Sequence, residues 1–305
     1  MNEFVMLCGI PGSGKSHCAE YLEKEEGYVV HSSDKLREEL GDVNDQSKNE
    51  EVFKILHQRV KEDLNAGKSV VYDATNLSRR RRVAFLQEIK NIPCRKVCVL
   101  IATPWEICLE QNDKRLRRVP DDVMWRMYKS FQMPSVYEGF DKVITFYGSE
   151  AWKEYYGNIA DYTYSLHGFG QENHHHELTL GKHMEYAGEI VLNEVGEWND
   201  VVYATFSHDI GKPVTKTFFN SKGEVGLEAH YYSHQNCGAY NCLFFKYDTD
   251  SKANKEYIAL LIESHMKPYM EWKQSEKAKE KDMKMFGEQF IQDVMTIHAA
   301  DVAAH

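Results

Sequence analysis

A glycine-rich octapeptide near the start of the sequence has the residue types needed to hold the phosphates of a nucleotide. Residues 9–16 read Gly-Ile-Pro-Gly-Ser-Gly-Lys-Ser and fit the pattern Gly-x-x-x-x-Gly-Lys-Ser/Thr in full. The glycines let backbone N–H groups curl around phosphate oxygens, so Lys15 is expected to reach the β- and γ-phosphates and Ser16 to ligate Mg²⁺. The predicted nucleotide-binding residues are Gly9, Gly12, Ser13, Gly14, Lys15 and Ser16. A glycine-rich turn without a ligand is the alternative, and the complete pattern disfavours it.

Histidines dominate the chemistry of the second half. Of the 14 histidines, 11 lie from His167 onward, whereas all 11 arginines lie before residue 127. Neutral imidazoles suit transition metals, while arginine forks suit phosphate oxygens. The candidate metal ligands are His183, the adjacent pair His208 and Asp209, His234, His265 and Asp301. Spacing alone does not choose between His234 and His230.

Three other groups of histidines and arginines are not assigned to a site. The run of residues 174–176, three consecutive histidines, is interpreted as an exposed loop, with a phosphate contact as the alternative. His298 and His305 stay unassigned. Four consecutive arginines, residues 79–82, are interpreted as a solvated helix face rather than a contact to nucleic-acid phosphates.

Two carboxylates of the first half have spacings that suggest chemistry. Asp34 and Arg37 stand three residues apart and therefore on one helix face, where a plain surface ion pair is the alternative. Asp73 ends an apolar segment. It is expected either to lie close to the Mg²⁺ or to cap the helix that follows, and both interpretations stay open.

The elements that must position these residues alternate between strands and helices in the first half. Strands are predicted at residues 4–9, 28–31, 69–73, 96–102 and 142–147. Helices are predicted at residues 15–24, 34–40, 49–64, 79–90, 104–114 and 121–131. This alternation predicts an α/β domain over residues 1–150, with a parallel sheet and helices on both faces.

The second half has longer helical patterns. Helices are predicted at residues 180–195, 198–209, 255–265 and 286–304, with a small hairpin around residues 220–223. The charged run of residues 273–284 is interpreted as a solvated helix face or loop. An all-α domain is therefore predicted over residues 165–305, with the join near residues 148–170.

The first half resembles the polynucleotide 5'-hydroxyl kinase domain of end-healing enzymes of the phage type. The likeness covers about residues 3–147, and it rests on the phosphate loop, Asp34-x-x-Arg37, Asp73-x-Thr75-Asn76, Lys114-Arg115 with Val119-Pro120, and Met127-Tyr128-Lys129-Ser130. It implies that Asp34 is the general base for a 5'-hydroxyl and that Arg37 holds the 3'-phosphate of that nucleotide. It also implies that Arg115 neutralises charge on the transferred phosphoryl group of ATP or another nucleoside triphosphate.

The second half resembles an HD-domain phosphohydrolase. The likeness covers about residues 165–305, and it rests on His208-Asp209-Ile210-Gly211-Lys212, Thr179-Leu180-Gly181-Lys182-His183 and Ala299-Ala300-Asp301. It implies a first metal site of His183, His208, Asp209 and Asp301, and a second completed by His234 and His265. One or two divalent transition metals (Mn, Fe, Ni, Co or Zn) would activate water and clamp phosphate oxygens, and Lys212 would add a positive charge.

Composition bounds the class of protein. The chain has 305 residues, a net charge of -10 and 42% hydrophobic residues, as expected of an ordinary globular protein rather than a disordered or collagen-like one. It contains no apolar run of the ~20 residues that a membrane span needs. The seven scattered cysteines include no Cys-x-x-Cys pair, so we expect reduced thiols in a cytoplasmic protein.

The two resemblances together imply a bifunctional nucleic-acid end-healing enzyme. It would phosphorylate 5'-hydroxyl ends and hydrolyse 3'-phosphate or 2',3'-cyclic phosphate ends of RNA or DNA, as RNA repair requires, and a separate ligase would seal them. The alternative is a small-molecule nucleoside or nucleotide kinase fused to a nucleotide-clearing HD phosphohydrolase. A non-catalytic, nucleotide-sensing second half is disfavoured by the complete ligand set. Because residues 151–305 carry -9 of the charge, short ends fit better than long duplex.

Overall fold

The computed structural model describes residues 1–41, 49–173, 177–247 and 253–305. The chain forms two compact units. The first contains Met1–Met127 and Pro134–Gly148, and the second contains Tyr128–Met133 and Ser149–His305. We expected the second domain to begin near residue 165, but its unit also takes in residues 149–164 and the short segment 128–133. No helix in the described ranges is long and apolar enough to cross a bilayer.

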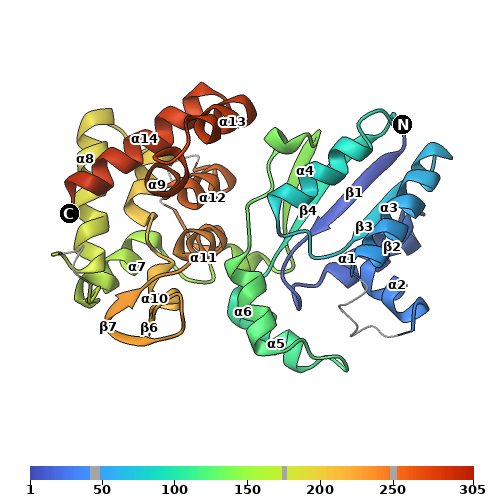
Figure 1. Cartoon of the computed structure of the whole chain (residues 1–305), viewed down its shortest axis with the longest axis horizontal. Coiled ribbons are helices and arrows are strands. Elements are labelled where there is room, and N and C mark those ends of the chain that lie inside the picture. The colour runs from blue at the N-terminus through green and yellow to red at the C-terminus, as the bar shows by residue number, and fades with distance from the viewer. Residues whose placement is uncertain (42–48, 174–176, 248–252) are drawn as a thin grey trace. The chain divides into compact units, whose positions relative to one another are not determined.

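The first unit is built on a five-stranded parallel sheet (Figure 1). Its strands are β1 (Glu3–Cys8), β2 (Val29–Ser32), β3 (Val70–Asp73), β4 (Arg95–Ala102) and β5 (Lys142–Tyr147), in the order β2-β3-β1-β4-β5. Because β1 lies at the centre, the loop that follows it leaves the carboxyl edge beside the ends of β3 and β4. That edge is where open parallel sheets bind their ligands.

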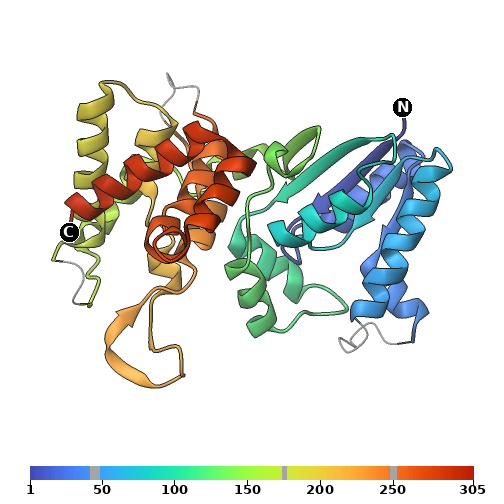
Figure 2. The ribbon, with the colours of Figure 1, turned by 45° about the horizontal axis from the view of Figure 1, so that its top comes forward.

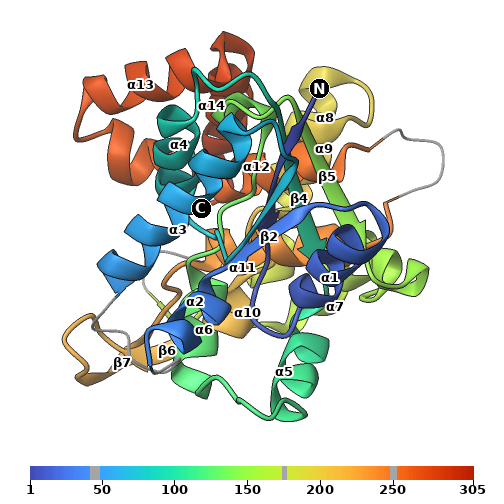
Figure 3. The same cartoon turned by 90° about the vertical axis from the view of Figure 1, so that its right-hand side faces the viewer.

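Helices cover both faces of this sheet, as predicted. Its helices are α1 (Lys15–Glu25), α2 (Ser33–Glu39), α3 (Asn49–Asn65), α4 (Arg79–Glu88), α5 (Trp105–Asp113) and α6 (Asp121–Lys129), with a 3₁₀ turn η1 (Val136–Glu138). Successive strand residues point to opposite faces. Val5 and Leu7 pack with Ala19 of α1, whereas Phe4 packs on the other face with Phe85 of α4. Figure 3 shows α1 on one side of the strands and α3 and α4 on the other.

The second unit is helical. Its principal helices are α7 (Ile159–Ser165), α8 (Leu180–Val195), α9 (Asp200–Ser207), α10 (Lys212–Thr215), α11 (His234–Asn241), α12 (Lys255–Ser264), α13 (Glu276–Phe286) and α14 (Glu288–Ala303). Short 3₁₀ turns are η2 (Glu150–Glu154), η3 (Leu166–Gly168) and η4 (Cys242–Phe244), and η5 (Pro268–Trp272) is a π-helix. The predicted hairpin is β6 (Thr217–Phe219) with β7 (Val225–His230), which extends away from the helices of this unit in Figure 2.

An apolar core joins α8, α9 and α14. Two of these helices carry candidate metal ligands, His183 in α8 and Asp301 in α14. Ala187 and Val191 of α8, Val202 of α9 and Ala300 of α14 are buried together. Small side chains at this contact let α8 and α14 approach closely.

The charged run expected to be a solvated face or loop forms most of α13, and only part of it is solvated, because Asp282 is buried. All seven cysteines lie in the described ranges and are free thiols, six of them buried.

Candidate active sites

The glycine-rich loop connects β1 to α1, as the sequence predicts. Gly12 and Gly14 have φ values of 82° and 98°, in the left-handed region that glycine adopts without strain. A Cβ on Gly12 would lie 2.3 Å from the carbonyl oxygen of Cys108, so the loop also packs too closely for a side chain there. The loop therefore requires glycine for both its backbone conformation and its packing.

The loop has polar groups suited to a phosphate ligand. The hydroxyl of Ser13 is buried and has no hydrogen-bond partner among the described residues. The Lys15 ammonium donates to the carbonyl oxygens of Gly9 and Ile10, both at 2.9 Å. Ser16 is exposed in the first turn of α1, whose N-terminus presents free N–H groups. A phosphate group fits this donor set, and it would give the buried Ser13 hydroxyl an acceptor.

Asp73 lies at the carboxyl edge of the sheet rather than at a helix cap. In the strand registers it stands opposite Leu7 of β1 and Ser32 of β2, and α4 begins six residues later with Ser78 as its N-cap residue. The capping interpretation is therefore wrong. Burial raises the pKa of the Asp73 carboxyl, while Lys15 opposes that shift. Burial lowers the pKa of the Lys15 ammonium, and the negative charge of Asp73 opposes that shift. This coupling indicates that Asp73 lies close to the phosphate loop.

Asp34 is held by two arginines, one of which the sequence analysis missed. Its carboxylate Oδ1 lies 3.2 Å from Nη1 of Arg37 and 3.3 Å from Nη1 of Arg117. Arg37 is buried and also donates to Oδ1 of Asn49 at 2.8 Å, whereas the side chain of Arg117 is 32% exposed. Of the two, Arg117 is therefore the one more open to solvent. Only the fold could identify it, because the segment after α5 returns to α2 across 83 residues of sequence.

The predicted lid arginine and the arginine run have different environments. Arg115 is exposed, and its charge contributes to lowering the pKa of Lys15. The interpretation of residues 79–82 as a solvated face is wrong for two of the four, because Arg79 and Arg82 are buried. Arg82 forms two 2.7 Å contacts with the carboxylate of Glu138 and donates to two backbone carbonyls. These two arginines therefore form part of the buried interior of the unit, where both lie beside Glu138.

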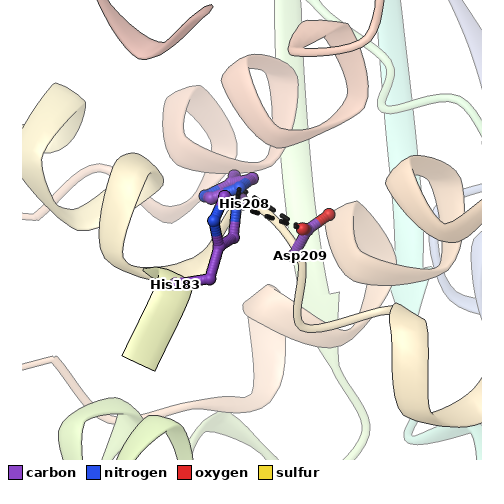
Figure 4. A group of neighbouring side chains, drawn as sticks. All are labelled: His183, His208 and Asp209. Atoms are coloured by element: carbon purple, nitrogen blue, oxygen red, sulfur yellow. Dashed lines mark hydrogen bonds and ion pairs between the residues drawn. The ribbon is translucent and has the colours of Figure 1, made fainter. Parts of the chain in front are cut away.

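In the second unit, six residues that lie far apart in the sequence meet at one buried point. They are His183 in α8, His208 and Asp209 directly after α9, His234 at the start of α11, His265 directly after α12 and Asp301 in α14. All six are buried. Figure 4 shows His183 and His208 beside the carboxylate of Asp209.

The four histidines share one orientation. Nδ1 of each faces a backbone carbonyl, at 3.3 Å for His183 and at 2.7–2.8 Å for the others, which are bonded to Thr205, Tyr231 and Ile262. A carbonyl only accepts, so Nδ1 must carry the hydrogen, and in the neutral ring Nε2 has the lone pair. Backbone contacts of this kind fix the tautomer of metal-bound histidines. All four Nε2 atoms therefore point into the same cluster, where each offers a lone pair when its ring is neutral.

The Nε2 atoms form two pairs, and Asp209 lies between them. His183 and His208 have their Nε2 atoms 3.2 Å apart, and His234 and His265 have theirs 3.2 Å apart. Two ligands each about 2.1 Å from one metal lie roughly 3.0–3.4 Å apart at octahedral or tetrahedral angles. Oδ2 of Asp209 lies 3.4 Å from His208, and its Oδ1 lies 3.1 Å from His234. One carboxylate thus faces both pairs with different oxygens.

Asp301 completes the first group. Its Oδ1 lies 3.0 Å from Nε2 of His183 and 3.5 Å from Nε2 of His208. Burial alone would lower the pKa of His208, but the carboxylates of Asp209 and Asp301 outweigh it and raise that pKa to about 10. Burial would raise the pKa of Asp209, yet Lys212 and His208 hold it well below its usual value. The electrostatics of the cluster therefore favour a buried positive charge, as a cation would supply.

Lys212 is part of the same cluster, as expected. Its ammonium lies 2.6 Å from Oδ2 of Asp209 and donates to Oε1 of Gln171 at 2.7 Å. It also lies 5.4 Å from the centre of the Tyr231 ring. Gln171 and Tyr231 were not recognised in the sequence, because neither belongs to a motif.

The structure also places the unassigned histidines. His230 ends β7 and stacks on Tyr232, so His234 rather than His230 contributes to the second pair. His298 packs edge-on against Tyr269, and Nε2 of His305 lies 3.6 Å from Oδ1 of Asp301. The three histidines of residues 174–176 lie outside the described residues.

Gly211 explains the glycine in the His-Asp-Ile-Gly-Lys motif. A Cβ there would lie 2.0 Å from the carbonyl oxygen of His234, so glycine lets α11 and its histidine pack against the Asp209 segment. We expect Gly211→Ala to lower the free energy of unfolding of this unit by about 1–3 kcal/mol, because backbone must move. Gly226→Ala is the control, since its nearest heavy atom would be 4.0 Å away. Urea unfolding of both variants measures the difference, and equal stabilities would contradict the packing argument.

Comparison with known proteins supports the nature of the first unit. Residues 4–134 match the family model described as an AAA domain. Together with the phosphate loop and the parallel sheet, this match defines the first unit as a P-loop domain of the kinase type. The second unit lies almost wholly outside the matched residues.

Particular relatives cover only part of the chain. It is 25% identical over 142 residues to an L-seryl-tRNA(Sec) kinase of Methanococcus maripaludis, and 28% identical over 176 residues to a mimivirus protein (Acanthamoeba polyphaga mimivirus) named "Putative bifunctional polynucleotide phosphatase/kinase". These matches cover 45% and 52% of this chain, and 55% and 38% of those proteins. A gluconokinase structure from Sinorhizobium meliloti aligns over 48% of this chain and 83% of its own, with 15% identity and a TM-score of 0.37.

Proposed function

We propose that this chain heals the ends of broken nucleic acids with two separate activities. The first unit phosphorylates 5'-hydroxyl ends with ATP or another nucleoside triphosphate and Mg²⁺. The second is an HD-type phosphohydrolase that removes 3'-phosphate or 2',3'-cyclic phosphate, as RNA repair requires. The observation that carries the second activity is the convergence of four histidine Nε2 atoms on the two oxygens of Asp209. The printed name of the mimivirus relative, which pairs a kinase with a phosphatase, is consistent with it.

In the kinase reaction the chain supplies positioning and charge. Asp34 accepts the proton of the 5'-hydroxyl, and its contacts to Arg37 and Arg117 hold the carboxylate in place. Lys15 and Arg115 neutralise charge on the transferred phosphoryl group. Ser16 and Asp73 are the residues that would hold Mg²⁺, and the ion would neutralise negative charge on the phosphates.

In the hydrolase reaction the chain supplies a closed set of ligands and one further cation. His183, His208, Asp209 and Asp301 would hold one divalent transition metal (Mn, Fe, Ni, Co or Zn), and Asp209, His234 and His265 a second. When bound, such metals lower the pKa of a water molecule and stabilise the charge of a phosphate undergoing attack. Lys212 keeps Asp209 ionised and adds positive charge on that side of the cluster.

The test is one incubation read at both ends of a substrate. A short RNA with a 5'-hydroxyl and a 2',3'-cyclic phosphate is incubated with ATP, Mg²⁺ and Mn²⁺, beside the matching DNA with a 3'-phosphate. We expect a new 5'-phosphate and loss of the terminal phosphate. Phosphorylation of free nucleosides in preference to these ends, with release of phosphate from mononucleotides, would favour a small-molecule kinase and a nucleotide-clearing hydrolase instead. Ends healed in this way would then need a separate ligase.

Arg37→Ala is expected to impair phosphorylation of a nucleoside 3'-phosphate much more than that of the free nucleoside. A charge-assisted contact to the 3'-phosphate is worth about 1.5–3 kcal/mol, or about ten- to a hundredfold. Because Arg37 also holds Asp34, both substrates lose some rate, so the ratio of kcat/KM values is the readout. Arg126→Ala is the control, since Arg126 is an exposed arginine of the same unit that pairs with Asp122. Equal losses on both substrates would give Arg37 a purely structural role.

A further inference from the structure

Asp301 uses its two carboxylate oxygens for different partners. Oδ1 faces the first histidine pair, at 3.0 Å from His183 and 3.5 Å from His208. Oδ2 accepts a hydrogen bond of 3.0 Å from the hydroxyl of Tyr269. Tyr269 was not recognised in the sequence, and nothing in the kinase or hydrolase mechanism above uses it.

The backbone around Tyr269 is built to hold it there. Tyr269 lies in the π-helix η5, which follows α12 and directly continues the segment that carries His265. A π-helix is wider than an α-helix and is frequently found at functional sites. This turn is tied to α13, because Nζ of Lys267 and Nε1 of Trp272 both donate to Oδ2 of the buried Asp282, at 2.8 and 2.9 Å.

A second contact fixes the ring itself. The Tyr269 ring packs edge-on against His298 of α14, with ring centres 4.4 Å apart. His298 stands one helical turn before Asp301, so one ring contact and one hydrogen bond join Tyr269 to the same helix face. The ring and the hydroxyl of Tyr269 are therefore both held by α14, and the hydroxyl has a fixed acceptor.

We propose that Tyr269 is a positioning residue for the metal ligand Asp301. By donating to Oδ2, its hydroxyl stops the carboxylate from rotating and leaves Oδ1 facing His183 and His208. The segment from His265 to Tyr269 then contributes to both metal-binding groups, directly through the histidine and indirectly through the tyrosine. This inference rests on the proposed metal-dependent hydrolase.

Tyr269→Phe removes only the hydroxyl, and the chain offers a matched control. Tyr257 of α12 donates to Oδ2 of Asp293 at 2.6 Å, which is the same kind of bond to the same helix two turns earlier. Neither Tyr257 nor Asp293 belongs to the metal-binding groups. Tyr257→Phe therefore reports what the loss of one tyrosine–carboxylate bond to α14 does to stability alone.

The experiment titrates Mn²⁺ into the metal-free 305-residue chain and its two variants and follows free Mn²⁺ by electron paramagnetic resonance. Loss of such an outer partner weakens metal affinity by about 10- to 100-fold, so we expect one Mn²⁺ to bind that much more weakly to Tyr269→Phe and unchanged to Tyr257→Phe. The visible absorption of the Co²⁺-loaded proteins is a second readout. We expect it to shift for Tyr269→Phe only, since a bond that merely supports folding does not change the ligands of the metal.

The outcomes separate this inference from the proposed function. Two Mn²⁺ ions bound equally well by wild type and Tyr269→Phe, with identical Co²⁺ spectra, would overturn the role of Tyr269 and leave the hydrolase standing. An equal loss of affinity in both variants would also overturn it, because it would show a general effect of loosening α14. A wild-type protein that binds no divalent transition metal would remove both proposals.

Discussion

Asp209→Ala is expected to abolish metal binding and end-phosphate hydrolysis together, while 5'-phosphorylation continues at the wild-type rate. Asp209 is the only carboxylate among the described residues whose two oxygens face both histidine pairs, so its loss removes a ligand from each proposed metal at once. The proposed kinase activity is expected to survive because Ser16, its proposed Mg²⁺ ligand, lies in the other unit. Elemental analysis and phosphate-release assays on 3'-phosphate and 2',3'-cyclic phosphate RNA measure the first two properties.

Folding must be separated from chemistry in this test. Asp209→Ala removes the carboxylate that pairs with the buried Lys212 ammonium, which destabilises the unit by itself. Asp209→Asn keeps the shape of the side chain and is the second variant, with thermal unfolding of the metal-free proteins as the control. Release of phosphate by a folded Asp209→Asn protein at the wild-type rate would show that the Asp209 cluster does not carry the hydrolysis.

Loss of a histidine from one pair should have a graded effect. His265→Ala is expected to weaken one of the two metals and leave the other in place, because His183, His208 and Asp301 do not depend on it. The matched control is His230→Ala, since His230 lies in the same unit but stacks on Tyr232 away from the cluster. Equal metal contents in the two variants would show that the second pair does not hold a metal.

Lys15→Ala and Asp34→Ala are expected to abolish 5'-phosphorylation while leaving hydrolysis intact. Removal of a general base costs about 10²- to 10⁴-fold in rate, and removal of a charge that stabilises the transferred group about 10²- to 10³-fold. Lys24→Ala is the control, because Lys24 lies on the same helix as Lys15 with its side chain 70% exposed. Radiolabelled ATP and 5'-hydroxyl RNA measure the rate.

The outcome for Asp34 decides its role. Near-normal turnover of Asp34→Ala at neutral pH would show that another group accepts the proton. Arg117→Ala distinguishes the remaining possibilities, since Arg117 contacts the same carboxylate oxygen as Arg37 but is more exposed. If Arg117 serves only to hold Asp34, its removal should lower kcat on every acceptor equally. A larger loss on acceptors with a 3'-phosphate would instead show that it binds that phosphate.

Features whose residues are neighbours in the chain could be predicted without a structure. The phosphate loop is local, because its glycines, Lys15 and Ser16 act within one strand–loop–helix turn. The βα alternation of the first half and the long helices of the second were also predicted, since apolar periodicity is the primary sequence signal of secondary structure. His208 and Asp209 were recognised for the same reason, because an adjacent pair needs no fold to bring it together.

Choices that depend on which segments meet required the three-dimensional fold. His230 and His234 are four residues apart. His230 ends β7 and stacks on Tyr232, whereas His234 begins α11 and lies in the cluster. Arg82 is charged and follows three other arginines, yet it is buried because it pairs with the carboxylate of Glu138, 56 residues away. Arg117 and Tyr269 carry no motif, and they acquire a role only because the fold places a guanidinium beside Asp34 and a hydroxyl beside Asp301. A buried charge or hydroxyl takes its function from its partner, and partners distant in sequence are chosen by packing.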